Sequence, residues 1–138
     1  GRRMRTLKSF ILVAPLVFAP VDSRADIYLK NYSDWNSMGP AERSGFAGGL
    51  VEGAAMMGFD DDTLALGVGL NTCVRDLKLD TKTLSEAITR RYELEPKDWS
   101  KSPIQVFAEQ IIFGACLKYI NEQRAKKTLP PWPLDKGQ

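Results

Sequence analysis

The first apolar pattern at helical spacing after the N-terminal 25 residues lies between residues 40 and 57. On a helix one arc is lined by four apolar side chains: Phe46, Leu50, Ala54 and Met57. Pro40 stands where a first-turn proline is favoured, and Gly58 follows the last apolar residue. The pattern predicts a helix from Pro40 to about Met57.

Glycine is unusually frequent inside this predicted helix. Gly45, Gly49 and Gly53 recur every four residues on a stripe that adjoins the apolar arc. With Gly48, the four interior glycines cost the helix about 3–4 kcal/mol relative to alanine. We therefore expect a close neighbour, first a second helix of the same chain, and second a dimer mate or bound partner.

The next apolar segment, Thr63–Cys73, is ambiguous. Its apolar residues alternate as in a strand up to Leu70, whereas Leu70, Cys73 and Leu77 step as in a helix. We favour a helix or irregular structure, because a single strand would have no partner. The Gly67-Val68-Gly69 triplet resembles the start of a dinucleotide fingerprint, but Thr72 replaces the third glycine and no βαβ context supports it.

Two further helices have clear start signals. Thr83–Glu86 fits a capping box, and Pro96 prevents that helix from continuing. Ser102–Gln105 combines a serine cap with a first-turn proline, and an apolar arc extends from there to about Arg124. The fold class predicted is all-α, a small bundle of about four helices.

The N-terminal 25 residues resemble a secretory signal peptide, with three extra residues before Met4. A basic start precedes the apolar run Phe10–Pro20, and Ser23–Ala25 fits a cleavage site. The apolar run is too short to span a bilayer. We therefore predict a signal peptide at 1–25, a helical domain at 26–128, a proline-rich tail at 129–138 and a periplasmic location.

Charge and cysteine content narrow the class of protein. The chain has 19 basic and 17 acidic residues, and 5 basic and 1 acidic residue of these belong to the leader, so residues 26–138 carry a net charge of −2. This balance does not suggest nucleic-acid binding. Two cysteines in an oxidising compartment, Cys73 and Cys116, predict one disulfide bond.

Several kinds of chemistry are disfavoured by the residues present. The chain has no histidine, which removes the usual nucleophile–histidine pairs, and two thiols alone supply too few ligands for a metal. Asp60, Asp61 and Asp62 resemble the start of an EF-hand loop, but Leu64 and Ala65 stand where further ligands and glycine are required. We predict a protein that is not an enzyme and holds neither cofactor nor metal.

The candidate partner-binding residues fall in three groups. Asp60–Asp62 form either a solvated capping loop or an acidic knob. Glu52 lies among glycines and is either an ordinary solvated glutamate or a carboxylate presented to a partner. Lys97, Asp98 and Trp99 lie in a loop between two prolines, where tryptophan either anchors an interface or packs on its own core.

The order of these segments resembles the Rap/Tai family of immunity proteins associated with bacterial type VI secretion. The resemblance covers residues 42–120 and rests on Phe46–Met56, Cys73, Leu79–Pro96 and Ser102–Cys116. It implies a periplasmic helical protein that binds a cognate peptidoglycan-cleaving effector, such as an amidase, and occludes its active site. The alternatives are a disulfide-containing periplasmic stress chaperone and a subunit of an envelope complex; a homodimer is compatible with each.

Overall fold

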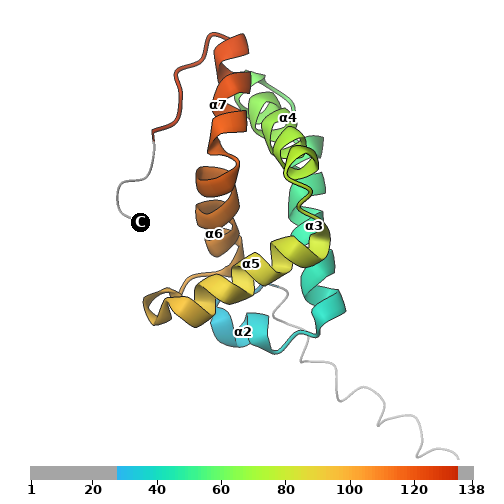
Figure 1. Ribbon diagram of the computed structural model, residues 1–138, viewed down its shortest axis with the longest axis vertical. Helices are drawn as coiled ribbons and strands as arrows, with labels where there is room; N and C mark the ends of the chain where they lie inside the picture. Colours follow the sequence, from blue (N-terminus) through green and yellow to red (C-terminus); the bar gives the residue numbers. More distant parts are fainter. Residues whose placement is uncertain (1–27, 134–138) are drawn as a thin grey trace, which may run out of the picture.

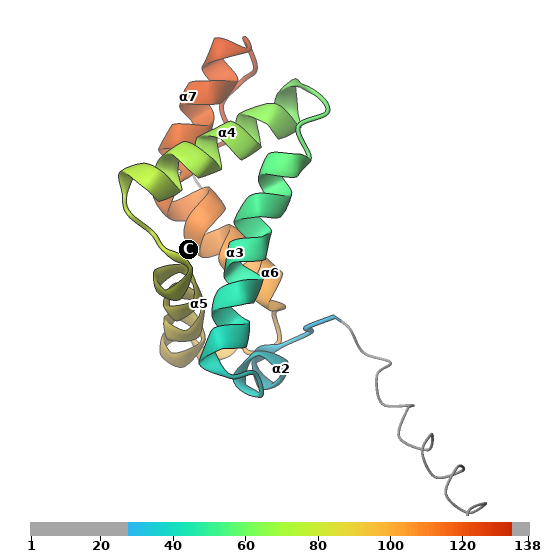
Figure 2. The same cartoon turned by 90° about the vertical axis from the view of Figure 1, so that its right-hand side faces the viewer.

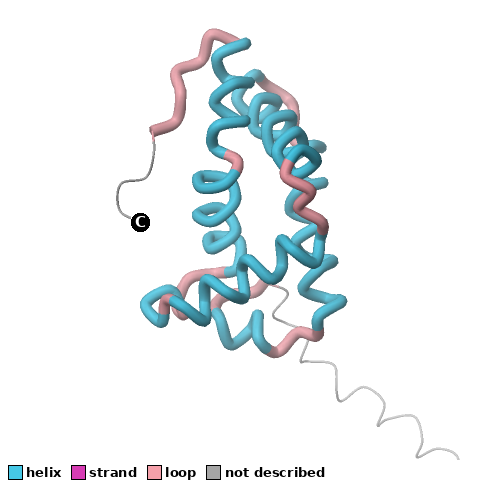
Figure 3. The backbone as a smooth tube through the Cα atoms, in the orientation of Figure 1, coloured by secondary structure: helices cyan, strands magenta, loops and turns pink. Residues whose placement is uncertain are grey.

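The computed structural model describes residues 28–133, which are helical and contain no strand (Figure 3). They form six α-helices: α2 (Tyr32–Asn36), α3 (Pro40–Met56), α4 (Asp61–Asp76), α5 (Thr81–Leu94), α6 (Pro103–Phe107) and α7 (Leu117–Lys126). A 3₁₀ turn covers Pro96–Asp98, and a π-helix covers Ala108–Ala115. The all-α prediction is confirmed for the described residues, whereas the predicted signal peptide lies outside them.

The prediction of about four helices was too low for two local reasons. The polar lead-in forms the short helix α2, because the side chain of Asn31 caps it by accepting from Asp34 N at 3.0 Å. The long helix predicted from Ser102 to Arg124 is divided into α6, the π-helix and α7. At its end the amide of Cys116 donates to Ile111 O at 2.7 Å, the five-residue spacing of a π turn.

The other helix starts follow from their caps. α3 begins at Pro40 as predicted, and Glu42 Oε1 accepts from the amide of Gly39 at 3.3 Å. The segment after Gly58 is a helix because Asp60 Oδ1 accepts from Thr63 N at 2.8 Å. The capping box predicted at Thr83 was wrong, because α5 already starts at Thr81 and Asp80 caps it through Thr83 N.

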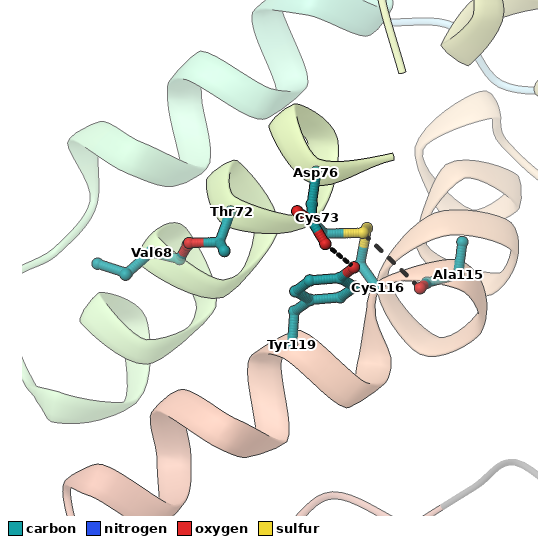
Figure 4. The surroundings of a disulfide bond; sticks show 7 residues. All are labelled: Val68, Thr72, Cys73, Asp76, Ala115, Cys116 and Tyr119. Atoms are coloured by element: carbon teal, nitrogen blue, oxygen red, sulfur yellow. Dashed lines mark hydrogen bonds between the residues drawn. A yellow bond between two sulfur atoms is a disulfide. The ribbon is translucent and has the colours of Figure 1, made fainter. Parts of the chain in front are cut away.

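The predicted disulfide between Cys73 and Cys116 is present, with a Cα–Cα distance of 5.4 Å. It joins α4 to the end of the π-helix, and both cysteines are fully buried (Figure 4). One turn further along each helix, the hydroxyl of Tyr119 donates to Asp76 Oδ2. Covalent and polar contacts therefore both hold α4 against the C-terminal part of the chain.

Helix α4 lies between α3 and α7, and α5 packs on the other end of α3 (Figures 1 and 2). The core has members from α2 to α7, and its largest fully buried side chains include Trp35, Leu70, Ile88, Tyr92 and Ile120. The indole of Trp35 donates to Thr89 Oγ1 at 2.9 Å, which joins α2 to α5. A single core thus connects the described helices.

The close helix approaches occur on α4 rather than on the glycine stripe of α3. A Cβ added at Gly69 would lie 2.6 Å from Ile120 Cα, and one at Gly67 would lie 2.7 Å from Ala54 O. In contrast, a Cβ at Gly45, Gly49 or Gly53 meets no atom of the described residues within 4 Å. The expectation that a second helix of the same chain covers the α3 stripe was therefore wrong.

The first residues of the proline-rich tail fold back along α7 (Figure 1). Asn121 exchanges two hydrogen bonds with the backbone of Trp132, at 2.9 and 2.8 Å. The Trp132 ring lies 4.9 Å from the Arg124 guanidinium and 5.3 Å from the ring of Phe113. Residues up to Pro133 are thus an ordered part of the domain surface.

Candidate functional site

The turn between α3 and α4 gathers exposed apolar side chains at one end of the long axis of the molecule (Figures 1 and 2). We call this surface the α3–α4 corner and define it by five residues: Met56, Met57, Phe59, Leu64 and Val68. Phe59 is 88% exposed and Met56 is 78% exposed. Large apolar groups exposed together on a small domain mark a surface that a partner covers.

The corner is held in shape by hydrogen bonds in the turn. Thr63 Oγ1 accepts from the amide of Phe59 at 3.1 Å and from that of Asp60 at 3.2 Å. In return the Asp60 carboxylate accepts from the backbone and hydroxyl of Thr63, at 2.8 and 2.9 Å. These bonds lower the pKa of Asp60. Phe59 is therefore presented outward on a fixed backbone.

A shallow groove of about 160 Å³ opens beside these side chains, between the end of α3 and α4. Its walls are Ala55 on one side and Leu64 and Val68 on the other, and Arg75 stands at its end. The backbone of Gly67 forms part of the floor, so the close approach of α4 to α3 also shapes the groove. The groove has room for one apolar side chain of a partner.

The three aspartates beside the corner are largely engaged within the chain. Asp60 is the helix cap, and Asp62 pairs with the buried guanidinium of Arg124 at 2.6 Å. Asp61 lies 3.8 Å from Lys127 Nζ. These residues join the start of α4 to the end of α7. Their carboxylates still border the corner, since Asp61 and Asp62 are more than half exposed.

Glu52 lies on the outward face of α3, one turn before the corner. Its side chain is exposed, and within the described residues it makes no ion pair or hydrogen bond. Neighbouring Gly49 and Gly53 leave the backbone around it uncovered. The carboxylate of Glu52 is thus free for a partner that covers α3 and the corner together.

Lys97, Asp98 and Trp99 lie far from the corner, at the opposite end of the long axis (Figure 1). Asp98 is fully buried and pairs with Arg91 Nε at 2.6 Å, so no partner can reach it. Lys101 Nζ stands 2.9 Å from Asp98 Oδ1, an ion pair without hydrogen-bond geometry. The same ammonium donates to both oxygens of Glu109 on the π-helix, at 3.0 and 2.9 Å.

Burial alone would raise the pKa of Asp98, but its close contacts with the charged groups of Lys101 and Arg91 outweigh burial and lower it. The contacts with Glu109 and Asp98 in turn raise the pKa of Lys101. Asp98 is therefore a structural charge that ties the loop after α5 to α5 itself and to the π-helix.

Trp99 remains half exposed although its polar group is satisfied. Its indole donates to Tyr92 O at 2.8 Å, its carbonyl accepts from Tyr32 N at 3.0 Å, and its ring packs 5.6 Å from that of Tyr32. Trp99 therefore packs in part on its own domain, and its role as an interface anchor stays a prediction. The sequence-predicted residues thus divide between two distant surfaces.

Sequence reasoning missed the apolar side chains of the corner, and it placed Met57 on the buried arc, whereas Met57 is 54% exposed. A usable signal was present in α4. Leu64 and Val68 share one face of a helix, while Leu66, Leu70 and Cys73 share another. In α4 the face with Leu70 and Cys73 is buried in the domain, whereas Leu64 and Val68 remain partly exposed.

Comparison with protein families, curated proteins and solved structures finds no match to this chain. Residues 28–133 include no helix with the length and hydrophobicity to cross a membrane. In the same range no cluster of three acidic or cysteine side chains is arranged to hold a metal ion.

Proposed function

We propose that this chain is a periplasmic immunity protein that binds a cognate peptidoglycan-degrading effector, such as an amidase, and occludes its active site. The observation that carries the proposal is the α3–α4 corner, where Phe59 and Met56 are exposed on a backbone fixed by the Asp60–Thr63 caps. Aromatic and methionine side chains are enriched in the buried centre of protein interfaces. The resemblance to the Rap/Tai family supplies the class of partner.

The mechanism is steric and needs no catalytic group of this chain. A convex apolar corner can enter a concave substrate cleft, and burial of Phe59 and Met56 would supply about 1.5–3 kcal/mol for each side chain. Little ordering entropy is lost on binding, because the turn is already fixed by its caps. Glu52 and Asp61 lie at the edge of the same surface, where they select for donors on the effector.

The test is protection against a secreted wall hydrolase of the producing organism. The protein should form a one-to-one complex with that hydrolase in titration calorimetry and prevent lysis when both are exported. Phe59→Asp should weaken binding at least 100-fold and abolish protection. Ile104→Asp, which changes a 53% exposed apolar residue near the opposite end, is the matched control and should bind normally.

The proposal fails if no wall hydrolase of the organism binds or is neutralised. It also fails if Phe59→Asp protects as well as the unchanged protein does, because the corner would then not be the inhibitory surface. Circular dichroism of both variants establishes that each retains its helices.

A stress chaperone is the second candidate, favoured by the same exposed apolar residues. Without histidine in the chain, an acid-triggered opening has to come from carboxylates. Asp98 is a buried carboxylate whose pKa is lowered, so its ion pairs with Arg91 and Lys101 persist until strongly acid pH. Suppression of client aggregation between pH 7 and pH 2 would support this function, and unchanged aggregation would reject it.

A further inference from the structure

A second and larger cavity, of about 610 Å³, lies between the first turns of α3 and the length of α5. We call it the α3–α5 groove. Figure 2 shows these two helices side by side in the half of the molecule away from the α3–α4 corner. Most of its lining residues carry a hydroxyl or a charge, although much of the surface they expose in the groove is aliphatic. The central ones for the argument are Arg43, Ser44, Ser85, Thr89, Arg90 and Glu93.

Arg43 is fixed at one wall of the groove. Its Nε donates to Trp35 O at 3.1 Å, and its Nη2 donates to the carbonyl and side-chain oxygens of Asn36, at 3.1 and 3.2 Å. The guanidinium also lies 5.8 Å from the centre of the Trp35 ring. Within the described residues Nη1 makes no hydrogen bond. One edge of a positioned guanidinium is therefore available to a ligand.

The wall between the helices carries ordered hydroxyl groups. Ser85 Oγ donates to Lys82 O at 2.9 Å and lies 3.4 Å from Ser44 Oγ. Thr89 Oγ1 donates to Ser85 O at 3.2 Å and accepts from the buried indole of Trp35 at 2.9 Å. Each hydroxyl oxygen has a second acceptor site. The hydroxyls of Ser44 and Thr89, which are partly exposed, can receive amide N–H groups of an extended peptide, whereas Ser85 is buried behind them.

The charged residues along α5 differ in whether they are paired within the domain. Lys82 and Glu86 neutralise each other at 2.6 Å, whereas Arg90 and Glu93 form no ion pair within the described residues. Two available guanidinium groups, Arg43 and Arg90, therefore line the groove, with a single free carboxylate at Glu93. This arrangement suits one carboxylate of a ligand. It disfavours nucleic acid, because Glu86 and Glu93 would face the phosphates.

We propose that the α3–α5 groove binds an extended polypeptide segment that carries an aspartate or glutamate, with Arg43 and Arg90 holding the carboxylate. The aliphatic stems of these arginines, with Pro40 and Ala87, contact the backbone and side chains of the segment. The groove is separate from the α3–α4 corner, so this binding does not depend on inhibition of a hydrolase.

The test is a titration of the ¹⁵N-labelled protein with a capped hexapeptide of alternating alanine and glutamate, followed by NMR. Saturable shifts are expected at the amides of Ser44, Ala87, Thr89 and Arg90, with a millimolar dissociation constant. A peptide with glutamine in place of glutamate should bind at least fivefold more weakly. Sodium acetate at equal carboxylate concentration should not reproduce the shifts; if it does, the groove takes a free carboxylate and the peptide proposal is overturned.

Arg90→Gln is the decisive variant, because Arg90 is exposed and makes no hydrogen bond or ion pair with another residue in the range 28–133. It should weaken the glutamate peptide at least fivefold and leave the glutamine peptide unchanged, whereas Glu93→Gln should tighten the glutamate peptide. Arg75→Gln removes an exposed arginine of α4 that does not line this groove, and it should have no effect. Equal binding by Arg90→Gln and the unchanged protein, or shifts scattered over the surface, would overturn the proposal.

Discussion

Two sets of glycines in neighbouring helices have opposite environments. Gly67 and Gly69 of α4 lie against the backbones of α3 and α7, where an added Cβ would overlap Ala54 O and Ile120 Cα. The three glycines of the α3 stripe face open space among the described residues. The three glycines with the conspicuous four-residue spacing are therefore not the ones whose Cβ would meet a neighbouring backbone.

The difference shows what determines a close helix approach. Spacing places side chains on one face, but the distance of the neighbouring backbone decides whether that face has room for a Cβ. Helix α4 is enclosed by α3 on one side and α7 on the other, so it has two such positions. In α3 a Cβ at Gly48 would lie 2.8 Å from Thr81 Cγ2, so this glycine has a close neighbour. Gly45, Gly49 and Gly53 cost helix stability without a packing gain among the described residues.

Among the changes that affect the packing of α4, removal of the disulfide should lower the free energy of unfolding most. The Cys73→Ser/Cys116→Ser double variant should lose about 4 kcal/mol of unfolding free energy, because the bond closes a loop with a sequence separation of 43 residues. Urea denaturation of both proteins measures the loss. An unchanged midpoint would mean that packing alone fixes α4 on α7.

Gly69→Ala should be nearly as disruptive. Its Cβ would meet the backbone of α7, which cannot move aside as a flexible side chain can, so we expect a loss of about 3 kcal/mol. The matched control is Gly49→Ala on α3. If both variants unfold at the same urea concentration, the contrast between the two helices is refuted.

Asp98→Asn tests how much the buried ion pairs at the end of the molecule opposite the α3–α4 corner contribute to stability. The glycine contacts of α4, in contrast, involve no charge. We expect a loss of about 2 kcal/mol at pH 7, because Arg91 and Lys101 lose their buried counter-ion. The pKa of Asp98 lies below its ordinary value of 3.8 in the folded protein, so its stabilisation is complete above about pH 5, where the unfolded chain is also fully ionised at this residue. It is lost as the pH falls through the folded pKa.

Thermal unfolding of the unchanged protein and of Asp98→Asn between pH 7 and pH 2 measures this difference. The two midpoints should converge as the pH falls through the folded pKa of Asp98, because the aspartate then becomes protonated in both folded and unfolded chains. A gap that stays constant over the whole range would show that the asparagine acts through shape rather than charge.

Gly49→Ala should produce the smallest change, and in the opposite direction. Alanine is favoured over glycine in a helix interior by about 1 kcal/mol, and its Cβ meets no described atom. The melting temperature should therefore rise by a few degrees. A loss of stability would indicate that residues outside the described range cover α3.

Local signals in the sequence predicted much of the fold. Pro40 marked the start of α3, and Ser102 marked the start of α6. The two cysteines predicted the disulfide. The π turn before Cys116 was not predictable, because Ala108–Ala115 has no proline and reads as an ordinary apolar helix. The burial of Asp98 also depends on Arg91 and Lys101, which meet it only after the loop has folded.

The candidate surfaces were harder to predict than the helices. The sequence left a capping loop and an acidic knob open for Asp60–Asp62, and Asp60 does cap α4. The pairing of Asp62 with Arg124, 62 residues later, could not be predicted from local sequence. Phe59 is apolar and was not considered a surface residue. Exposure depends on which neighbours a helix end lacks, and periodicity within one helix carries no information about that.

The bare face of α3 has a consequence for how this protein can change over time. Because no described side chain rests on Gly45, Gly49 or Gly53, substitutions there leave the α4–α7 contacts and the disulfide undisturbed. Mutations on this face therefore lower stability little, whereas most mutations in a small domain are removed by selection because they destabilise the fold. A lineage can alter what binds α3 one residue at a time, while the rest of the fold stays constant.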